Sequence, residues 1–259
     1  YTDNHPKVAQ SYNNVGSVYK IIGRYQEALE YYKQALEMKK GLYKGNHPSI
    51  ASSLNSLGDI YIILGQPEEA LKCYQEALAM RKTLYARNHP EIANSLCHLG
   101  DFYQSLGQYQ EALKYYQEAL AMRKMLYTGN HPDIAVSLNS MGNVYQALNK
   151  HQDALKYYKE ALAMREAVYQ DDHPDIAITL NNLGTVYKAL GEYQEALKYY
   201  QQALVMRRAL YRCNHPDILI SLNNIADVYK ALGQPQEALK YSDQALTMKQ
   251  ALDIDHTSC

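Results

Sequence analysis

The sequence predicts an all-α solenoid, in which short helical hairpins stack on one another. The dipeptide His-Pro recurs at residues 5, 47, 89, 131, 173 and 215, so a unit of 42 residues is written six times. Each unit holds two amphipathic stretches, and a unit of this size must stack on its neighbours to bury a core. We therefore expect one domain over residues 1–259, with repeats at about 5–46, 47–88, 89–130, 131–172, 173–214 and 215–256.

The first helix of each repeat, helix A, is predicted to begin at the His-Pro dipeptide. In the third repeat, apolar side chains follow at steps of three and four residues: Ile92, Leu96, Leu99, Tyr103 and Leu106. This spacing places them on one face of a helix over about 90–106. Pro90 suits the first helical turn, where its missing N–H costs nothing, and Gly107 ends the helix.

The second helix, helix B, follows after a connection of two or three residues. Its apolar side chains also recur at helical spacing: Ala112, Leu113, Tyr116, Ala119, Leu120, Met122 and Leu126. They predict a helix over about 109–127, which Gly129 and Asn130 end. The short connection forces the two helices antiparallel, so six repeats predict twelve helices.

Small residues recur where the two helices of a hairpin should meet. Helix A carries Gly16, Gly58, Gly100, Gly142, Gly184 and Ala226, and helix B carries Ala28, Ala70, Ala112, Ala154, Ala196 and Ala238. A glycine inside a helix costs about 1 kcal/mol relative to alanine. Close contact between helix A and helix B is the simplest gain that offsets this loss.

These residues resemble the tetratricopeptide repeat. The match in the third repeat consists of Leu99-Gly100, Tyr103, Gly107, Ala112, Tyr116 and Ala119, and it recurs in all six units. The period of 42 exceeds the usual 34 and resembles the kinesin light chain type of this repeat. The resemblance implies a right-handed α-α superhelix of six hairpins, which acts as a non-catalytic scaffold for protein–protein interaction. Asn149 replaces the turn glycine of the fourth repeat, which asparagine tolerates because it enters the left-handed region readily.

Composition excludes several other classes. The 26 Lys and Arg residues balance 27 Asp and Glu residues, so no basic stripe for nucleic acid is expected. No apolar stretch approaches the length that spans a bilayer, so we expect no membrane association. Four scattered cysteines without a Cys-x-x-Cys pair predict reduced thiols and a cytoplasmic location. The chain lacks an initiator Met and begins within a repeat motif, which predicts that it is part of a longer protein.

The resemblance also implies where a ligand binds, because helix A lines the concave face in this family. The candidate peptide-binding residues on that face are Asn13, Asn14, Lys20, Asn55, Asp59, His98, Asp101, Asn139, Asn143, Asn181, Asn182, Lys188, Asn223, Asn224, Asp227 and Lys230. A row of asparagines can pair with the backbone of an extended peptide, since each amide carries donors and an acceptor. The alternative is that each asparagine satisfies a neighbouring helix.

The charges on this face argue against an acidic ligand. Lys20, Lys188 and Lys230 are offset by Asp59, Asp101 and Asp227. Domains of this family that clamp acidic tails need Lys or Arg at several of these positions, and kinesin light chains use a basic groove. We therefore expect a protein or extended peptide ligand that need not be acidic.

Cofactors, metals and catalytic residues are not expected. The six histidines of the His-Pro dipeptides lie one repeat apart, too far to share a metal, and are read as helix-entry residues. His98 and Asp101 lie three residues apart but lack a third ligand or a nucleophile. No phosphate-binding glycine loop is present.

Two further hypotheses remain open at this stage. The array could be the sensor or regulatory arm of an enzyme whose catalytic domain precedes residue 1. Nearly identical repeats could also stack end to end, which would give weak self-association or a structural assembly.

Overall fold

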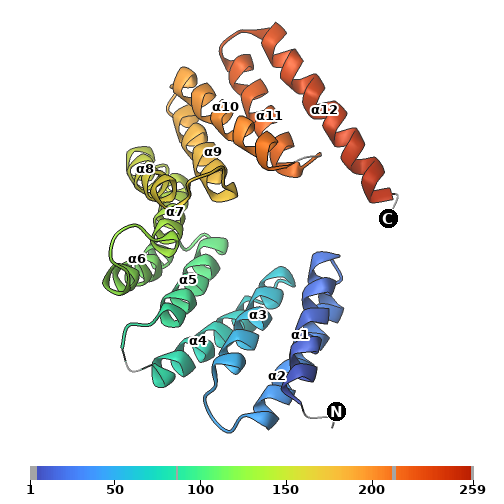
Figure 1. Ribbon diagram of the computed structural model, residues 1–259, viewed down its shortest axis with the longest axis vertical. Coiled ribbons are helices and arrows are strands. Elements are labelled where there is room, and N and C mark those ends of the chain that lie inside the picture. The colour runs from blue at the N-terminus through green and yellow to red at the C-terminus, as the bar shows by residue number, and fades with distance from the viewer. Residues whose placement is uncertain (1–4, 86, 212–213, 258–259) are drawn as a thin grey trace. The chain divides into compact units, whose positions relative to one another are not determined.

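The helices follow the register that the repeat predicts. The computed structural model describes residues 5–85, 87–211 and 214–257, with side chains as far as 252, and these residues form twelve α-helices and no strand (Figure 1). Their bounds are α1 Pro6–Ile21, α2 Tyr25–Leu42, α3 Pro48–Ile63, α4 Pro67–Leu84, α5 Pro90–Ser105, α6 Tyr109–Leu126, α7 Pro132–Ala147, α8 His151–Val168, α9 Pro174–Ala189, α10 Tyr193–Leu210, α11 Pro216–Ala231 and α12 Pro235–Thr257. Odd numbers are helix A and even numbers helix B. In the third repeat both helices begin where predicted and end one residue earlier.

The histidine of each His-Pro dipeptide caps a helix A. The Nδ1 atom of His47 accepts a hydrogen bond of 3.1 Å from the backbone N–H of Ser49, and His173 accepts one of 3.1 Å from Asp175. The preceding tyrosine stacks on the histidine ring, with 3.5 Å between the ring centroids of Tyr43 and His47. An imidazole that accepts at this position satisfies one of the free N–H groups of the first turn. The predicted helix-entry role is confirmed.

Helix A and helix B of each hairpin approach closely at the glycine. A Cβ atom at Gly58 would lie 2.5 Å from the ring of Tyr74, and one at Gly100 would lie 2.5 Å from the ring of Tyr116. Real Cβ atoms do not tolerate such distances, so glycine is required wherever helix B carries this tyrosine. The predicted close contact is confirmed.

One turn departs from glycine. Five of the seven glycines with positive φ end a helix A, among them Gly65, Gly107 and Gly191, but the fourth repeat uses Asn149, with φ of 57°. Asparagine populates this left-handed region more readily than other residues with a side chain. The substitution therefore keeps the turn, as predicted.

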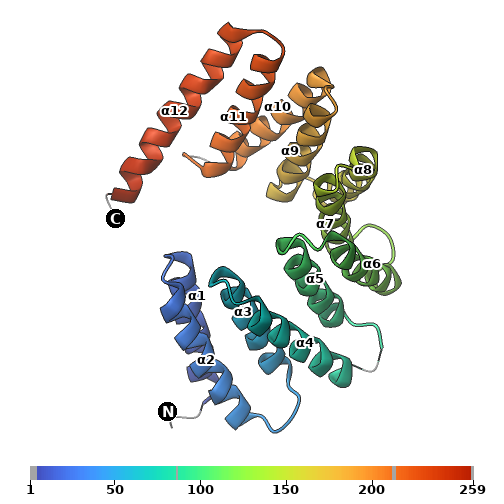
Figure 2. The same ribbon diagram turned by 180° about the vertical axis from the view of Figure 1, so that it is seen from behind.

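Contacts divide the chain into two units, residues 1–127 and 128–259. Each unit contains three hairpins. Within each unit the two helices of a hairpin lie side by side, and each helix B packs against the next helix A (Figure 1 and Figure 2). This consecutive hairpin packing confirms the all-α solenoid, while the single domain over 1–259 stays a prediction.

A buried cation joins neighbouring hairpins, and the sequence analysis did not identify it. It comes from the last turns of helix B, and its side chain is 4% exposed in each case: Lys39, Arg81, Arg123, Arg165 and Arg207. Arg207 donates to Ser221 Oγ at 2.7 Å and to the backbone carbonyl of Asp217 at 2.8 Å, both in the next repeat. Burial lowers the pKa of Lys39, Arg81, Arg165 and Arg207.

No helix in the described part of the chain is long and apolar enough to cross a membrane.

Candidate peptide-binding face

The predicted asparagines of unit 2 bond to one another across neighbouring A helices. Asn182 on α9 donates to Asn139 Oδ1 at 3.4 Å and to Asn143 Oδ1 at 3.3 Å, both on α7. Asn224 on α11 donates to Asn181 Oδ1 at 2.9 Å. These bonds favour the alternative reading, in which asparagines satisfy their neighbours. Because an amide carries two N–H donors and two acceptor lone pairs, each side chain keeps further groups for a ligand.

Two predicted asparagines differ from this pattern by their exposure. Asn223 on α11 is exposed and forms no hydrogen bond with another side chain that the structure describes. Asn14 on α1 is also exposed and accepts a bond of 3.0 Å from Gln10 on its own helix. Asn13 exchanges long contacts of 3.5 Å with Ser53 of the next helix A. Asn223 and Asn14 thus have the most freedom to meet a partner.

The predicted lysines are paired with aspartates of the next repeat. Lys20 lies 3.3 Å from Asp59, and Lys188 lies 3.2 Å from Asp227. Lys230 lies 3.9 Å from Asp227 on its own helix. Such partly exposed pairs contribute little stability, but they neutralise the helix A face locally. The expectation that the positive charges are offset is confirmed for these residues.

The hydroxyl of the core tyrosine in helix B donates a hydrogen bond to the side chain that follows the glycine in helix A. Tyr74 donates to Asp59 at 2.8 Å, Tyr116 donates to Asp101 at 2.5 Å, and Tyr158 donates to Asn143 at 2.7 Å. The pKa of Tyr74, Tyr158 and Tyr200 is raised, mainly because these phenols are buried. The sequence analysis assigned the tyrosine to the core but missed its hydroxyl, which fixes the orientation of the residues on the helix A face.

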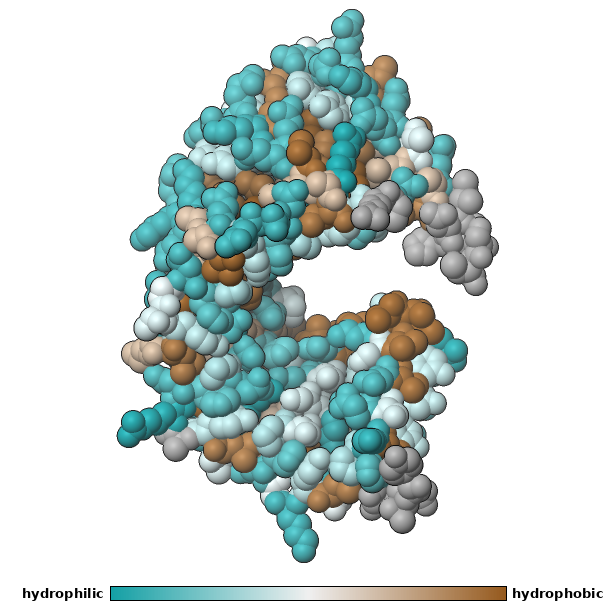
Figure 3. Space-filling view, in the orientation of Figure 1, coloured by the Kyte–Doolittle hydropathy of each residue, from teal (hydrophilic) through white to brown (hydrophobic). Residues whose placement is uncertain are grey.

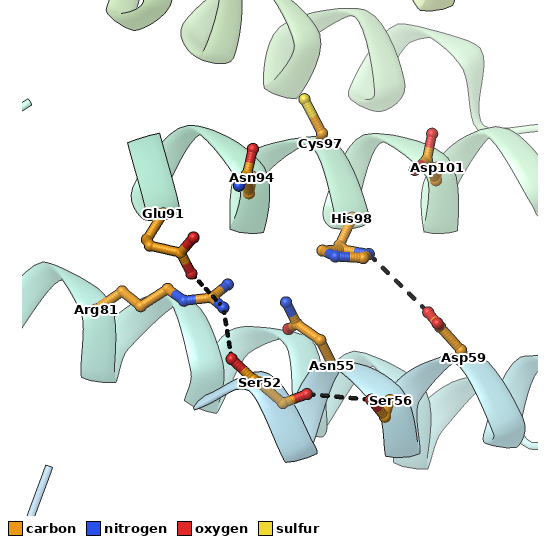
Figure 4. A pocket seen from close by; sticks show the side chains of 10 residues that line it. All are labelled: Ser52, Asn55, Ser56, Asp59, Arg81, Glu91, Asn94, Cys97, His98 and Asp101. Atoms are coloured by element: carbon orange, nitrogen blue, oxygen red, sulfur yellow. Dashed lines mark hydrogen bonds and ion pairs between the residues drawn. The ribbon is translucent and has the colours of Figure 1, made fainter. Parts of the chain in front are cut away.

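A polar pocket of about 390 Å³ opens between α3 and α5 in unit 1 (Figure 4). Four predicted residues line it: Asn55, Asp59, His98 and Asp101. Ser56 and Cys97 lie on the same helix faces, whereas the following lining residues were not anticipated: Ser52, Arg81, Glu91 and Asn94. A cation repeated every 42 residues, from Lys39 to Lys249, was the sequence signal for Arg81.

Arg81 is fixed at one end of this pocket. Its guanidinium donates to Ser95 Oγ at 2.6 Å and lies 2.8 Å from the carboxylate of Glu91. Figure 4 shows its contacts with Glu91 and Ser52. Its charge is therefore already balanced within the protein.

His98 and two aspartates form the other end. The His98 ring stacks on Tyr74 with 5.9 Å between centroids, and its Nδ1 lies 3.9 Å from Asp59 Oδ1. The pKa of Asp101 is raised, because the surrounding protein reduces its hydration although the side chain still reaches solvent. The hydrogen bond from Tyr116 and the nearby His98 act in the opposite direction.

Two of the four cysteines lie in the described part of the chain. Cys73 and Cys97 form no disulfide, and burial raises the pKa of Cys73 to about 11. Cys213 and Cys259 lie outside the described residues. Over the part of the chain that is described, no three His, Cys, Asp or Glu side chains are grouped so that they could hold a metal ion.

Family models decide the family of this chain. The model of the tetratricopeptide repeat matches residues 7–83, 91–167 and 175–251, and a second model of the same description matches 55–124 and 139–210. The chain belongs to the tetratricopeptide repeat family. The predicted resemblance is thereby confirmed, and no curated protein is similar enough in sequence to count as a match.

Solved structures agree with this family. Tetratricopeptide-like repeats assigned to a kinesin light chain of Podosopora anserina are 27% identical, with a TM-score of 0.67, over 80% of this chain and 98% of theirs. BtubC (BKLC) of P. vanneervenii is 20% identical, with a TM-score of 0.74, over 95% of this chain and 92% of its own. PilF of Pseudomonas aeruginosa is 19% identical, with a TM-score of 0.62, over 96% and 98%. The last two share the fold alone.

Proposed function

We propose that this tetratricopeptide array is a non-catalytic scaffold that holds an extended peptide or partner segment along the helix A face. The observation that carries the proposal is the row of amides on α7, α9 and α11, which repeats at a fixed spacing. An extended peptide presents N–H and C=O groups at regular intervals, and the unused groups of the amides suit both. Cys73 and Cys97, which form no disulfide, support a cytoplasmic setting.

The experiment uses a peptide selected from a random library against the whole chain. Its dissociation constant is compared between the wild type and the double variant Asn181→Ala/Asn223→Ala. We expect binding at least about tenfold weaker in the variant, since lost hydrogen bonds of about 1 kcal/mol each multiply. Gln194→Ala, at an exposed site in the first turn of α10, is the matched control and should bind as the wild type does. Equal affinity of the double variant and the wild type would show that the peptide does not bind at these residues of the helix A face.

A second candidate, end-to-end self-association, is supported by the exposed faces of the first and last hairpins. Val18 on α1 is 57% exposed, while its counterpart one repeat later, Ile60, is fully buried. Leu239 on α12 is 61% exposed, while Leu197 at the same repeat position is 6% exposed. Figure 3 shows the apolar patch on α1. The residues that form the seams between repeats are thus uncovered at both ends and suit a second copy of the chain.

The mass of the particle in solution tests this second candidate. We expect the weight-average mass from light scattering to rise with concentration, and Val18→Lys to abolish the rise. A mass that stays at one chain over the accessible concentrations would exclude self-association. The third hypothesis, a regulatory arm of an enzyme, stays a prediction.

A further inference from the structure

Asp101 lacks the cation that its counterparts have. At this repeat position, the potential partner is the residue 39 positions earlier, on the preceding helix A. It forms an ion pair in two repeats: Lys20 with Asp59 and Lys188 with Asp227. In two other repeats the corresponding residues are uncharged: Gln104 with Asn143 and Gln146 with Thr185. Before Asp101, however, this residue is Ile62. Among these five pairs, that of Ile62 with Asp101 places a carboxylate opposite an apolar residue.

The contacts of Asp101 agree with its lack of an ion-pair partner. Tyr116 donates one hydrogen bond to it, and no Lys, Arg or His of the described residues comes within ion-pair distance. Asp59, at the same repeat position on α3, has Lys20 at 3.3 Å and His98 at 3.9 Å. An uncompensated carboxylate beside a pocket is a place where a cation from outside the chain gains a partner.

An interruption of the amide pairing leaves a second acceptor in the same pocket. In α9 and α11 the donor to the preceding helix is an asparagine, Asn182 or Asn224, but α5 carries His98 at this position. The ring of His98 stacks on Tyr74 instead. Asn55 on α3 is 5% exposed, and its Oδ1 has no hydrogen-bond partner among the residues that the structure describes. Figure 4 shows its amide between Arg81 and His98, directed toward α5.

The charges that line the pocket sum to a negative site. Three carboxylates, Asp59, Glu91 and Asp101, line it together with one arginine, Arg81. Glu91 and Arg81 neutralise each other at 2.8 Å. Lys20, which lies outside the lining, offsets Asp59, and His98 Nδ1 lies 3.9 Å from the carboxylate of Asp59. The volume of about 390 Å³ is in the range of pockets that accept a small group.

We propose that the pocket between α3 and α5 binds a basic side chain, lysine or arginine, of the partner segment. This inference rests on the proposed function and specifies one residue of the partner. Asp101 pairs with the positive charge, and Asn55 Oδ1 accepts one of its N–H groups. An arginine fits this task best, because its guanidinium can bond to a carboxylate with two N–H groups and has three left.

The chain itself supplies the test variants. Ile62→Lys recreates the pairing of Lys20 with Asp59 and should occupy Asp101 from within, whereas Ile62→Gln recreates the neutral residue of the third and fourth repeats. Asp101→Asn recreates Asn143, which keeps its hydrogen bond from the tyrosine hydroxyl. All three side chains already occur at these positions in the chain, so each variant is expected to fold.

The probe is N-acetyl-L-arginine amide, and its neutral isostere N-acetyl-L-citrulline amide is the control. Binding is followed by NMR through the side-chain signals of Asp101, Asn55 and His98. We expect the arginine derivative to shift these signals saturably with a millimolar dissociation constant, and citrulline to leave them unchanged. Affinity should fall at least about tenfold in Ile62→Lys and Asp101→Asn, and stay within about twofold in Ile62→Gln.

Two results would overturn the inference. One is equal shifts with arginine and citrulline, and the other is unchanged affinity in Asp101→Asn. The selected peptide separates this failure from a failure of the proposed function. If that peptide still depends on Asn181 and Asn223 while arginine does not bind, only the basic pocket is wrong. If the affinity of the peptide does not depend on those asparagines while arginine binds, the basic pocket is supported and the assignment of the helix A face as the peptide site is wrong.

Discussion

The ring of Tyr116 lies across Gly100, so that a Cβ atom at residue 100 would fall 2.5 Å from a ring carbon. The sixth repeat differs at both corresponding positions, with Ala226 in place of the glycine and Ser242 in place of the tyrosine. The two residues therefore change together within one chain. A small side chain in helix A is required by the aromatic ring in helix B.

Gly100→Ala should destabilise the protein although alanine favours helices. Overpacking of this kind costs about 1–3 kcal/mol, which exceeds the gain of about 1 kcal/mol in helix propensity. Chemical denaturation of the variant measures the change. In the background Tyr116→Ser the same substitution should cost nothing or stabilise, and an equal cost in both backgrounds would show that the ring is not the cause.

Arg207→Met should destabilise the junction between the fifth and sixth repeats by about 2–3 kcal/mol. The substitution leaves the Asp217 carbonyl and Ser221 hydroxyl without their buried donor. Arg207→Lys should cost less, because Lys39 occupies this position in the first repeat and bonds to Ser53 at 2.7 Å. The neighbouring Arg208 donates an exposed hydrogen bond of 2.9 Å to Gln244 of the sixth repeat, so Arg208→Met is the control for an unburied contact at the same junction and should stay within about 0.5 kcal/mol. Thermal unfolding measures the loss of stability. An equal loss in Arg208→Met and Arg207→Met would contradict the role of buried Arg207 at this junction.

The protein should lose stability above about pH 10, because its buried tyrosines resist ionisation. The pKa of Tyr158 in the folded state lies above its ordinary value of 10.0, chiefly through burial. The stabilisation is thus complete below pH 10 and is lost as the pH rises toward the folded value, at up to about 1.4 kcal/mol per pH unit for each such group. Tyr158→Phe should be less stable at neutral pH by about 1 kcal/mol but should lose stability less steeply in alkali. Denaturation curves at successive pH values give both slopes, and equal slopes would contradict the assignment.

Asp101→Asn should stabilise the protein at neutral pH by less than about 1 kcal/mol, since the group reaches solvent and its electrostatics are screened. The pKa of Asp101 is raised, so the folded state disfavours the carboxylate above that pKa. The difference between variant and wild type should therefore shrink as the pH falls and Asp101 becomes protonated.

Asp59→Asn is the matched comparison. It removes the partner of Lys20, so it should not stabilise. The free energies of unfolding of both variants at neutral and acid pH decide the question. Stabilisation by both to the same extent would show that Lys20 does not compensate Asp59.

The sequence predicted the fold closely, because the period of 42 places every residue in a repeat position. The starts of α5 and α6 and the close approach of helix A to helix B at Gly100 followed from this register, whereas the contact of Gly100 with the ring of Tyr116 was not predicted. Helical spacing alone determines which face is apolar. It does not require knowledge of how neighbouring hairpins are spaced.

The contacts of the candidate site could not be predicted in this way, because they depend on the spacing between neighbouring hairpins. Whether Asn182 meets Asn139 or a ligand depends on the distance between α7 and α9, which no pattern within one repeat gives. The unpaired Oδ1 of Asn55 likewise arises from His98 in the next repeat, so it becomes visible only when the two helices are side by side. The cation at Arg81 was missed because a basic residue in the last turn of a helix is ordinarily exposed.

NMR of the side-chain amides of asparagine, with the library-selected peptide bound to the whole chain, decides whether the peptide lies on the helix A face. We expect the largest shifts on the amides of helix A, with Asn223, Asn181 and Asn143 among them. Shifts confined to residues of helix B, with those amides unchanged at saturation, would contradict this expectation.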